Sequence, residues 1–134
     1  MGKTGVTGIK RIINAAGYSW KGICSAYKHE AAFRQELWMA AVLVPAGIFL
    51  GGTLLDKAML VSSVLFVLIV ELLNSAIESV VDRVSDEHHE LAGRAKDMGS
   101  AAVLFALVIT AIVSAAVLIE HPPVTFGTSP GLLG

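Results

Sequence analysis

Three long apolar stretches constrain this chain more than any other feature of its sequence. Residues 37–55 and 98–119 contain no charged side chain over 19 and 22 residues. Residues 58–81 are apolar over 24 residues, apart from two glutamates, an asparagine and serines. A helix rises ~1.5 Å per residue, so each stretch can cross a hydrocarbon core of roughly 30 Å. The sequence therefore predicts an all-α membrane protein with transmembrane helices at about 35–55, 58–81 and 98–119.

The composition supports a membrane protein. The chain is 54% hydrophobic and 16% charged, with a mean hydropathy of +0.70, whereas about a quarter of a soluble domain's residues are charged. A length of 134 residues predicts one domain, which we assign to residues 1–121. Residues 122–134 are rich in Pro and Gly and are predicted to form a disordered tail. No basic run is longer than Lys10-Arg11, which argues against a nucleic-acid partner. The single Cys24 excludes an intrachain disulfide.

The lysines and arginines predict the orientation of the spans. Nine of the ten lie either before residue 35 or in the 82–97 segment, and only Lys57 lies between the first two spans. Because basic residues favour the cytoplasmic side, we expect the N-terminus and the 82–97 segment to be cytoplasmic. The turn at Asp56 and Lys57 and the C-terminus then face outward.

Residues 9–29 are predicted to form an amphipathic helix on the membrane surface. Apolar side chains recur there at helical spacing, while the basic ones lie mostly elsewhere on the helix. The apolar positions are Ile9, Ile12, Ile13, Ala16, Trp20, Ile23 and Tyr27. Such a helix either anchors the chain or controls the access of a lipid substrate.

The second span carries a stripe of polar residues, which we call the acidic stripe. Glu71, Asn74, Glu78 and Asp82 are spaced i, i+3, i+7 and i+11 and so share one helix face. A carboxylate at mid-bilayer costs roughly 2.5–3.5 kcal/mol, so such residues indicate a function. Catalysis or metal binding is one hypothesis. A polar interface between subunits, a proton or cation relay, and a helix that leaves the bilayer near Glu71 are the alternatives.

Residues outside the second span can complete a site. Glu30 and Glu36 precede the first span and can share a divalent ion with the stripe, because Mg²⁺ prefers carboxylate and phosphate oxygens. We expect Glu30 to meet the stripe across a subunit boundary. Arg11, Arg94 and Lys96 can hold phosphate oxygens. The alternatives are that the 82–97 segment is a solvated linker and that Lys96 extends to the membrane interface. Neither common glycine-rich nucleotide motif is present in the sequence.

Four blocks of sequence resemble the prokaryotic diacylglycerol kinase family. They are IINAAGYSWKG (12–22), EAAFRQE (30–36), VELLNSAIESVVDR (70–83) and HELAGRAKDMGSAAV (89–103). The resemblance covers residues 9 to about 119. It implies a homotrimer in the bacterial inner membrane, with active sites shared between neighbours. It also implies phosphorylation of diacylglycerol to phosphatidic acid at the inner leaflet, with ATP as donor and Mg²⁺ as cofactor.

The resemblance also implies roles for individual residues. Glu71 is similar to the general base, Glu30 and Glu78 to the metal ligands, and Asn74 to a residue that orients the base or the substrate. The implied ATP-binding residues are Arg11, Tyr18, Glu30, Glu78, Glu87, His88, His89, Lys96 and Asp97. The implied lipid-substrate residues are Arg11, Ser19, Trp20, Phe33, Arg34, Gln35, Glu36, Glu71 and Ser100.

Two alternatives to a diacylglycerol kinase remain open. A kinase for undecaprenol or another lipid alcohol is compatible with the same scaffold. A non-enzymatic channel or transporter, with Glu71 and Glu78 as a relay, is the alternative from a different class. It gives Glu30 and Lys96 no reason to approach the stripe.

Overall fold

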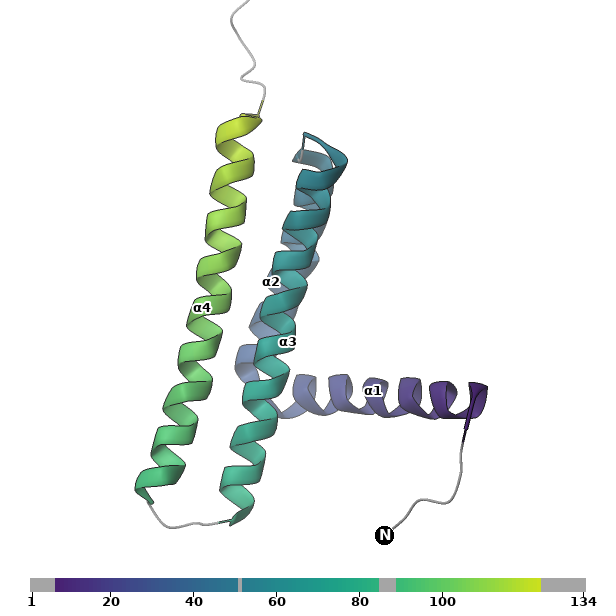
Figure 1. The fold of residues 1–134 in the computed structure, drawn as a ribbon, viewed down its shortest axis with the longest axis vertical. Helices are drawn as coiled ribbons and strands as arrows, with labels where there is room; N and C mark the ends of the chain where they lie inside the picture. The colour runs from purple at the N-terminus through teal and green to yellow at the C-terminus, as the bar shows by residue number, and fades with distance from the viewer. Residues whose placement is uncertain (1–6, 51, 85–88, 124–134) are drawn as a thin grey trace, which may run out of the picture.

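The computed structural model describes residues 7–50, 52–84 and 89–123, which form four helices (Figure 1). In chain order these are α1 (Ile9–His29), α2 (Ala31–Leu50), α3 (Leu54–Val84) and α4 (Glu90–Glu120). Figure 1 shows α2, α3 and α4 running along one axis as a bundle, whereas α1 projects sideways from it. The prediction of an all-helical chain is confirmed, and α1 occupies the range predicted for the N-terminal helix.

Three of the described helices, α2, α3 and α4, are long and apolar enough to cross a membrane. Two of them, α3 and α4, have 31 residues each, which corresponds to about 46 Å at 1.5 Å per residue. The hydrocarbon core of a bilayer is only roughly 30 Å thick. Parts of both helices therefore extend beyond the apolar layer, and these parts can carry polar chemistry.

A sharp corner separates α1 from α2. Glu30 adopts an extended conformation with φ −112° and ψ 107°, which ends α1 at His29. Arg34 Nη1 donates to the carbonyl oxygens of Tyr27 at 2.7 Å and Lys28 at 3.2 Å. These carbonyls lack partners within the helix, so the guanidinium caps the C-terminus of α1. The corner places Glu30 beside the bundle, in the region that we call the α1 end.

The connection between α2 and α3 includes Gly52 and Thr53. The Asp56 N–H donates to Thr53 Oγ1 at 3.1 Å, and the Thr53 N–H donates to Asp56 Oδ2 at 2.9 Å. This reciprocal cap starts α3. The prediction of a turn at Asp56 and Lys57 is therefore wrong, because both residues lie in the first turn of α3. The first helix of the bundle also ends at Leu50 rather than at residue 55.

A histidine links the end of α4 to this connection. His121 Nδ1 lies 3.0 Å from Asp56 Oδ2, an ion pair when the imidazole is protonated. The imidazole also lies against Gly52, where a Cβ would overlap it. We call the region of Gly52, Thr53, Asp56 and His121 the turn end.

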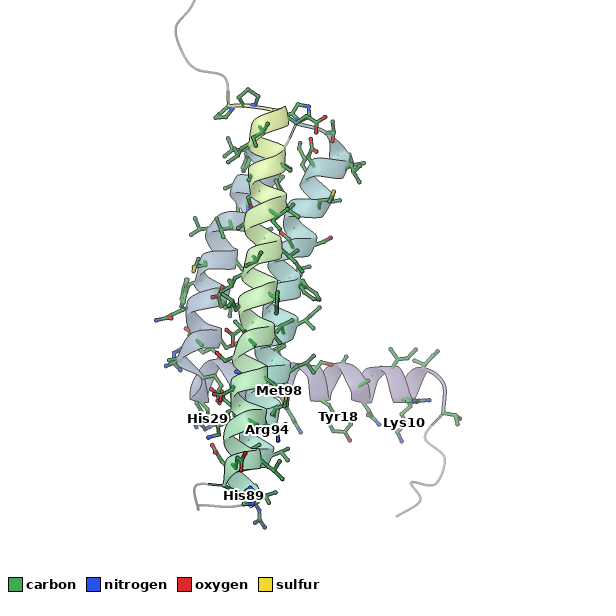
Figure 2. All side chains as sticks on the ribbon, turned by 60° about the vertical axis from the view of Figure 1, so that its left-hand side comes forward. Lys10, Tyr18, His29, His89, Arg94 and Met98 are labelled. Carbon is green, nitrogen blue, oxygen red and sulfur yellow. The ribbon has the colours of Figure 1, made fainter. Side chains whose placement is uncertain are left out.

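The centre of the bundle is α3. It packs against both α2 and α4, whose backbones do not contact each other within the described residues. The buried core is small and includes Phe33, Val67 and Ala106. Many large apolar side chains of the bundle face outward (Figure 2), such as Phe49 and Phe105, which are 85% and 70% exposed. A surface of this kind is stable only against lipid or further protein.

Candidate functional site

The acidic stripe on α3 passes from the interior of the chain to its surface. Glu71 is buried, with 5% of its surface exposed, and Ser75 one turn later is also buried. Asn74 and Glu78 are partly buried, and Asp82 is exposed. Other parts of the protein therefore cover the stripe at Glu71, and the stripe becomes exposed towards Asp82.

Asn74 and Glu78 are connected to each other. Asn74 Nδ2 donates a hydrogen bond to Glu78 Oε1 at 3.1 Å, as the i, i+4 spacing on a helix allows. The amide therefore holds one oxygen of the Glu78 carboxylate, and this carboxylate has a defined orientation before any ligand binds.

Four carboxylates gather at the α1 end. The charges of Glu36, Glu78 and Glu30 all act on Glu71. Glu36 comes from α2 and Glu30 from the corner before it, so three segments contribute to the cluster. We call these four residues the carboxylate cluster. All four residues belong to one chain here, and the expectation that Glu30 meets the stripe across a subunit boundary stays a prediction.

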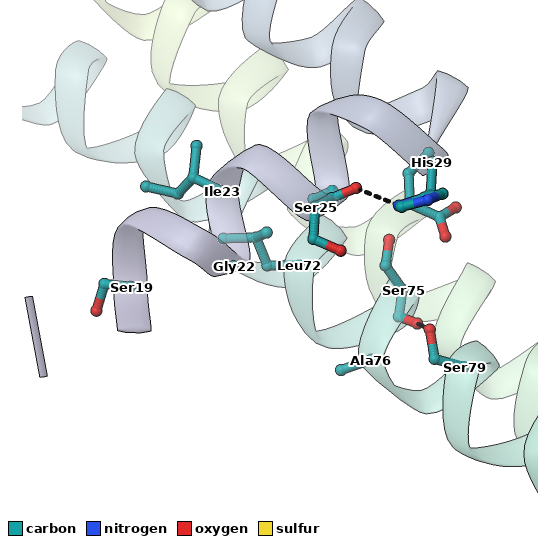
Figure 3. A pocket seen from close by; sticks show the side chains of 11 residues that line it. Ser19, Gly22, Ile23, Ser25, His29, Leu72, Ser75, Ala76 and Ser79 are labelled. Atoms are coloured by element: carbon teal, nitrogen blue, oxygen red, sulfur yellow. Dashed lines mark hydrogen bonds between the residues drawn. The ribbon is translucent and has the colours of Figure 1, made fainter. Parts of the chain in front are cut away.

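A cavity of about 530 Å³ lies between α1 and α3 beside the cluster (Figure 3). Its polar wall includes Ser19, His29, Glu30, Ser75 and Ser79. Three of these groups already have a backbone carbonyl as a local acceptor. The Ser19 hydroxyl donates to the Ala15 carbonyl at 2.9 Å. The Ser79 hydroxyl donates to the Ser75 carbonyl at 2.8 Å, and His29 Nδ1 lies 3.0 Å from the Ser25 carbonyl. Part of the cavity wall is polar and the rest is apolar, which suits a lipid with a polar head group.

The cationic side of the site comes from α4. Lys96 Nζ forms an ion pair with Asp82 Oδ1 at 2.7 Å, and the charge of Glu78 also acts on Lys96. The bundle thus brings Lys96 next to the stripe, as the sequence hypothesis requires. Asp97 is exposed on the same helix. A cation beside the carboxylates can neutralise phosphate oxygens.

Other predicted nucleotide contacts do not converge on the cluster in this chain. Arg11 and Tyr18 are exposed on α1, and Figure 2 shows Tyr18 away from the bundle. The His89 side chain caps α4, with Nδ1 accepting from the Leu91 N–H at 3.1 Å. Glu87 and His88 lie outside the described residues. The nucleotide roles of these residues stay predictions.

The predicted lipid contacts fall into different environments. Phe33 is 2% exposed and belongs to the core. Arg34 caps α1, and Ser19 lines the cavity. Glu71 is buried and Glu36 partly buried. The remaining members are exposed: they are Arg11, Trp20, Gln35 and Ser100. Only Ser19, Glu36 and Glu71 therefore lie at the cavity or the cluster.

The carboxylate cluster fits a magnesium–nucleotide complex. No group of three or more Asp, Glu, His or Cys side chains arranged to hold a metal occurs among the described residues. A Mg²⁺ ion that accompanies a nucleotide does not need one, because it uses one or two carboxylates together with phosphate oxygens and waters. Glu30 and Glu78 are the residues of the carboxylate cluster that would hold such an ion.

One residue next to the stripe, Gly99, was not predicted from the sequence. Gly99 on α4 is buried, and a Cβ there would overlap Asn74 Oδ1. The sequence offers no signal that separates it from Gly93 on the same helix, because only the packing of α4 on α3 decides which glycine meets the stripe.

Comparisons with known proteins cover most of the chain. Residues 17–118 match the family model described as prokaryotic diacylglycerol kinase. The chain is 53% identical to a protein named diacylglycerol kinase from Escherichia coli K12, over 86% of this chain and 94% of the relative. It is 51% identical to a protein of the same name from Haemophilus influenzae, over 84% and 95%. A similarly named protein from Pseudomonas aeruginosa is 49% identical over 86% and 94%.

Proposed function

The chain belongs to the prokaryotic diacylglycerol kinase family, and we propose that it phosphorylates diacylglycerol from ATP, with Mg²⁺, at the carboxylate cluster. The family match supports the kinase activity and its lipid substrate. The observation that carries the location is that Glu30, Glu36, Glu71 and Glu78 interact within one chain, beside a cavity and Lys96. A like-charge cluster of this kind is stabilised by a bound cation.

The depth of each carboxylate suggests its role. Glu71 is the most buried member of the cluster and lies deepest along α3, where a lipid hydroxyl arrives from the membrane. It acts as the general base. The hydroxyl oxygen attacks the γ-phosphorus while its proton passes to Glu71. The bond between the γ-phosphorus and the β–γ bridging oxygen breaks, and ADP leaves.

The remaining residues position and neutralise the phosphates. Phosphoryl transfer depends on positioning and charge stabilisation more than on covalent help from the protein. Glu30 and Glu78 hold Mg²⁺, which when bound offsets the charge of the phosphates. Lys96 adds a second positive charge next to Glu78. Asn74 orients the Glu78 carboxylate through its hydrogen bond.

We place the α1 end at the cytoplasmic face of the bacterial inner membrane. Nine of the ten lysines and arginines belong to the segments at this end. The sideways course of α1 (Figure 1) and the exposed apolar side chains of Ile9, Ile12 and Ile13 suit a helix that lies in the membrane surface. ATP then reaches the cluster from water and diacylglycerol from the bilayer.

We also propose that three copies of the chain assemble. Within one chain the core is small, and the cavity between α1 and α3 is open. A neighbouring copy can cover this opening, so that water is excluded during transfer. Small residues next to the stripe, such as Ala76 and Ser79, permit close approach of another helix.

A phosphorylation assay in mixed micelles tests the proposal. Purified chain is given MgATP and a panel of lipid alcohols that includes diacylglycerol and undecaprenol. We expect phosphatidic acid as the main product, and at least about a hundredfold less of it from Glu71→Gln. Glu120→Gln, the same change at the turn end, should retain full activity. Preferred phosphorylation of undecaprenol would support the alternative acceptor. Ion flux through vesicles without kinase activity would support a channel.

A further inference from the structure

Gly99 on α4 faces a polar group of the site across the helix interface. It is buried, and a Cβ built on it would overlap Asn74 Oδ1 and lie 3.2 Å from Asn74 Cγ. An ordinary side chain here would have to displace the Asn74 amide or separate α4 from α3. By contrast, an added Cβ would have nothing within 4 Å at Gly17, Gly22 and Gly93.

The Asn74 amide is confined on both sides. Its Nδ2 donates to Glu78 Oε1 at 3.1 Å, while its Oδ1 is buried against Gly99 without a hydrogen-bond partner among the described residues. Turning the amide over would place its oxygen against a carboxylate oxygen, and neither atom can donate a hydrogen. One orientation of the amide is therefore strongly preferred.

Holding the Asn74 amide in this orientation costs free energy, which indicates that the orientation has a function. A buried carbonyl oxygen without a partner is rare, because it loses its hydrogen bonds to water on folding. The packing of α4 nevertheless holds it in this state. What the arrangement achieves is the hydrogen bond on the other side of the amide, which fixes one oxygen of Glu78.

We propose that Gly99 is a positioning residue of the kinase site: its missing side chain seats Asn74 so that the amide fixes Glu78 for magnesium. The inference rests on the proposed role of Glu78 as a metal ligand. The amide holds Oε1 of Glu78, so Oε2 would be the oxygen that binds the ion. Groups that orient a metal ligand in this way typically change metal affinity 10–100-fold when they are altered.

The amide itself provides a test that needs no catalysis. Asn14 and Asn74 are the only asparagines in the chain, so asparagine labelled with ¹⁵N in the side chain gives two pairs of NMR signals in micelles. Asn14 is exposed on α1 and serves as an internal reference. Gly99→Ala should shift the Asn74 signals and leave those of Asn14 in place. Gly93→Ala, the same change on the same helix, should shift neither.

Titration with Mg²⁺ alone extends this measurement to the metal. In the wild-type chain the Asn74 signals should respond to Mg²⁺, and Gly99→Ala should raise the concentration needed for the half-maximal response about tenfold. Unchanged Asn74 signals in Gly99→Ala, or an unchanged response to Mg²⁺, would overturn the inference.

Kinetics separate positioning from a general packing defect. Gly99→Ala should raise the Mg²⁺ concentration for half-maximal activity about tenfold and leave the KM for diacylglycerol unchanged. In an Asn74→Ala background there is room for the methyl group, so Gly99→Ala should have no further effect. Equal losses from Gly99→Ala in both backgrounds would contradict a role that acts through Asn74.

Two further outcomes are that Gly99→Ala fails to fold and that the wild-type chain lacks kinase activity. If Gly99→Ala alone does not fold, the double variant Gly99→Ala/Asn74→Ala should fold, since the overlap is gone. A double variant that also fails to fold would show that Gly99 is needed for packing alone. If the wild-type chain phosphorylates no lipid, the proposed function fails, while the NMR comparison still decides whether Gly99 seats Asn74.

Discussion

The two ends of the bundle use similar residues in opposite ways. At each end a glycine lies against a polar side chain, Gly52 against His121 and Gly99 against Asn74. At the turn end the Asp56 carboxylate accepts from the Thr53 N–H and faces His121, so the acid has partners within the chain. At the α1 end the charges of three carboxylates act on a fourth, Glu71.

This difference separates groups that hold the fold together from groups that bind a ligand. A carboxylate with a cap and an ion-pair partner stabilises the local structure, and nothing further is needed. Like charges held close together destabilise the chain unless a cation joins them. The carboxylates at the α1 end therefore lower the local stability of the chain and serve a function instead. The following variants test this difference between the two ends.

The largest effect is expected at Glu71. Glu71→Gln keeps the shape of the side chain but cannot accept a proton, so turnover should fall by about 10²–10⁴-fold. Activity in micelles and MgATP binding are measured together, and binding should persist. The matched Glu120→Gln variant should behave as wild type. Substantial turnover by a folded Glu71→Gln chain would remove the base from the mechanism.

Mixed oligomers test whether one chain builds the cluster. Glu30→Gln and Glu71→Gln chains are mixed under conditions in which subunit exchange is demonstrated by labels. Because Glu30 acts on Glu71 within a single chain, every site in the mixture lacks one of the two carboxylates if copies of the cluster stay separate. We expect no activity above the sum of the parents. Recovery of activity would place the two residues of one site in different chains.

The proposed metal ligands should show a smaller and selective effect. Glu30→Gln and Glu78→Gln should each raise the Mg²⁺ concentration for half-maximal activity by about 10–100-fold, the range typical of groups around a metal. The double variant should be no worse than the poorer single one, since both hold the same ion. Multiplicative losses in the four-variant cycle would assign them to separate functions.

The smallest effect on catalysis is expected at the turn end. Asp56→Ala removes the acceptor for the Thr53 N–H and the partner of His121. Loss of such a cap typically destabilises a protein by about 1 kcal/mol. We expect a lower unfolding midpoint in micelles and unchanged kcat and KM for the folded enzyme. A loss of turnover without a change in the unfolding midpoint would contradict the assignment of Asp56 to stability alone.

Much of the fold was predictable because it depends on local sequence. Long uncharged runs require helices in a membrane, and the i, i+3, i+7 spacing places Glu71, Asn74 and Glu78 on one face whatever surrounds them. The start of α3 was misplaced although the Thr53-x-x-Asp56 capping pattern is present. Charged residues suggested a turn at Asp56 and Lys57, whereas the reciprocal cap makes them part of the helix.

The sequence by itself determined the helical class, the apolar segments and the polar face of α3, because these follow from hydropathy and from the period of the helix. Only the tertiary structure decided what this face meets. The extended Glu30 turns α1 away from the bundle and places its carboxylate where its charge acts on Glu71. The packing of α4 on α3 selects Gly99 rather than Gly93 to face Asn74. Contacts between helices depend on the relative rotation and depth of each pair, and no spacing within one helix encodes them.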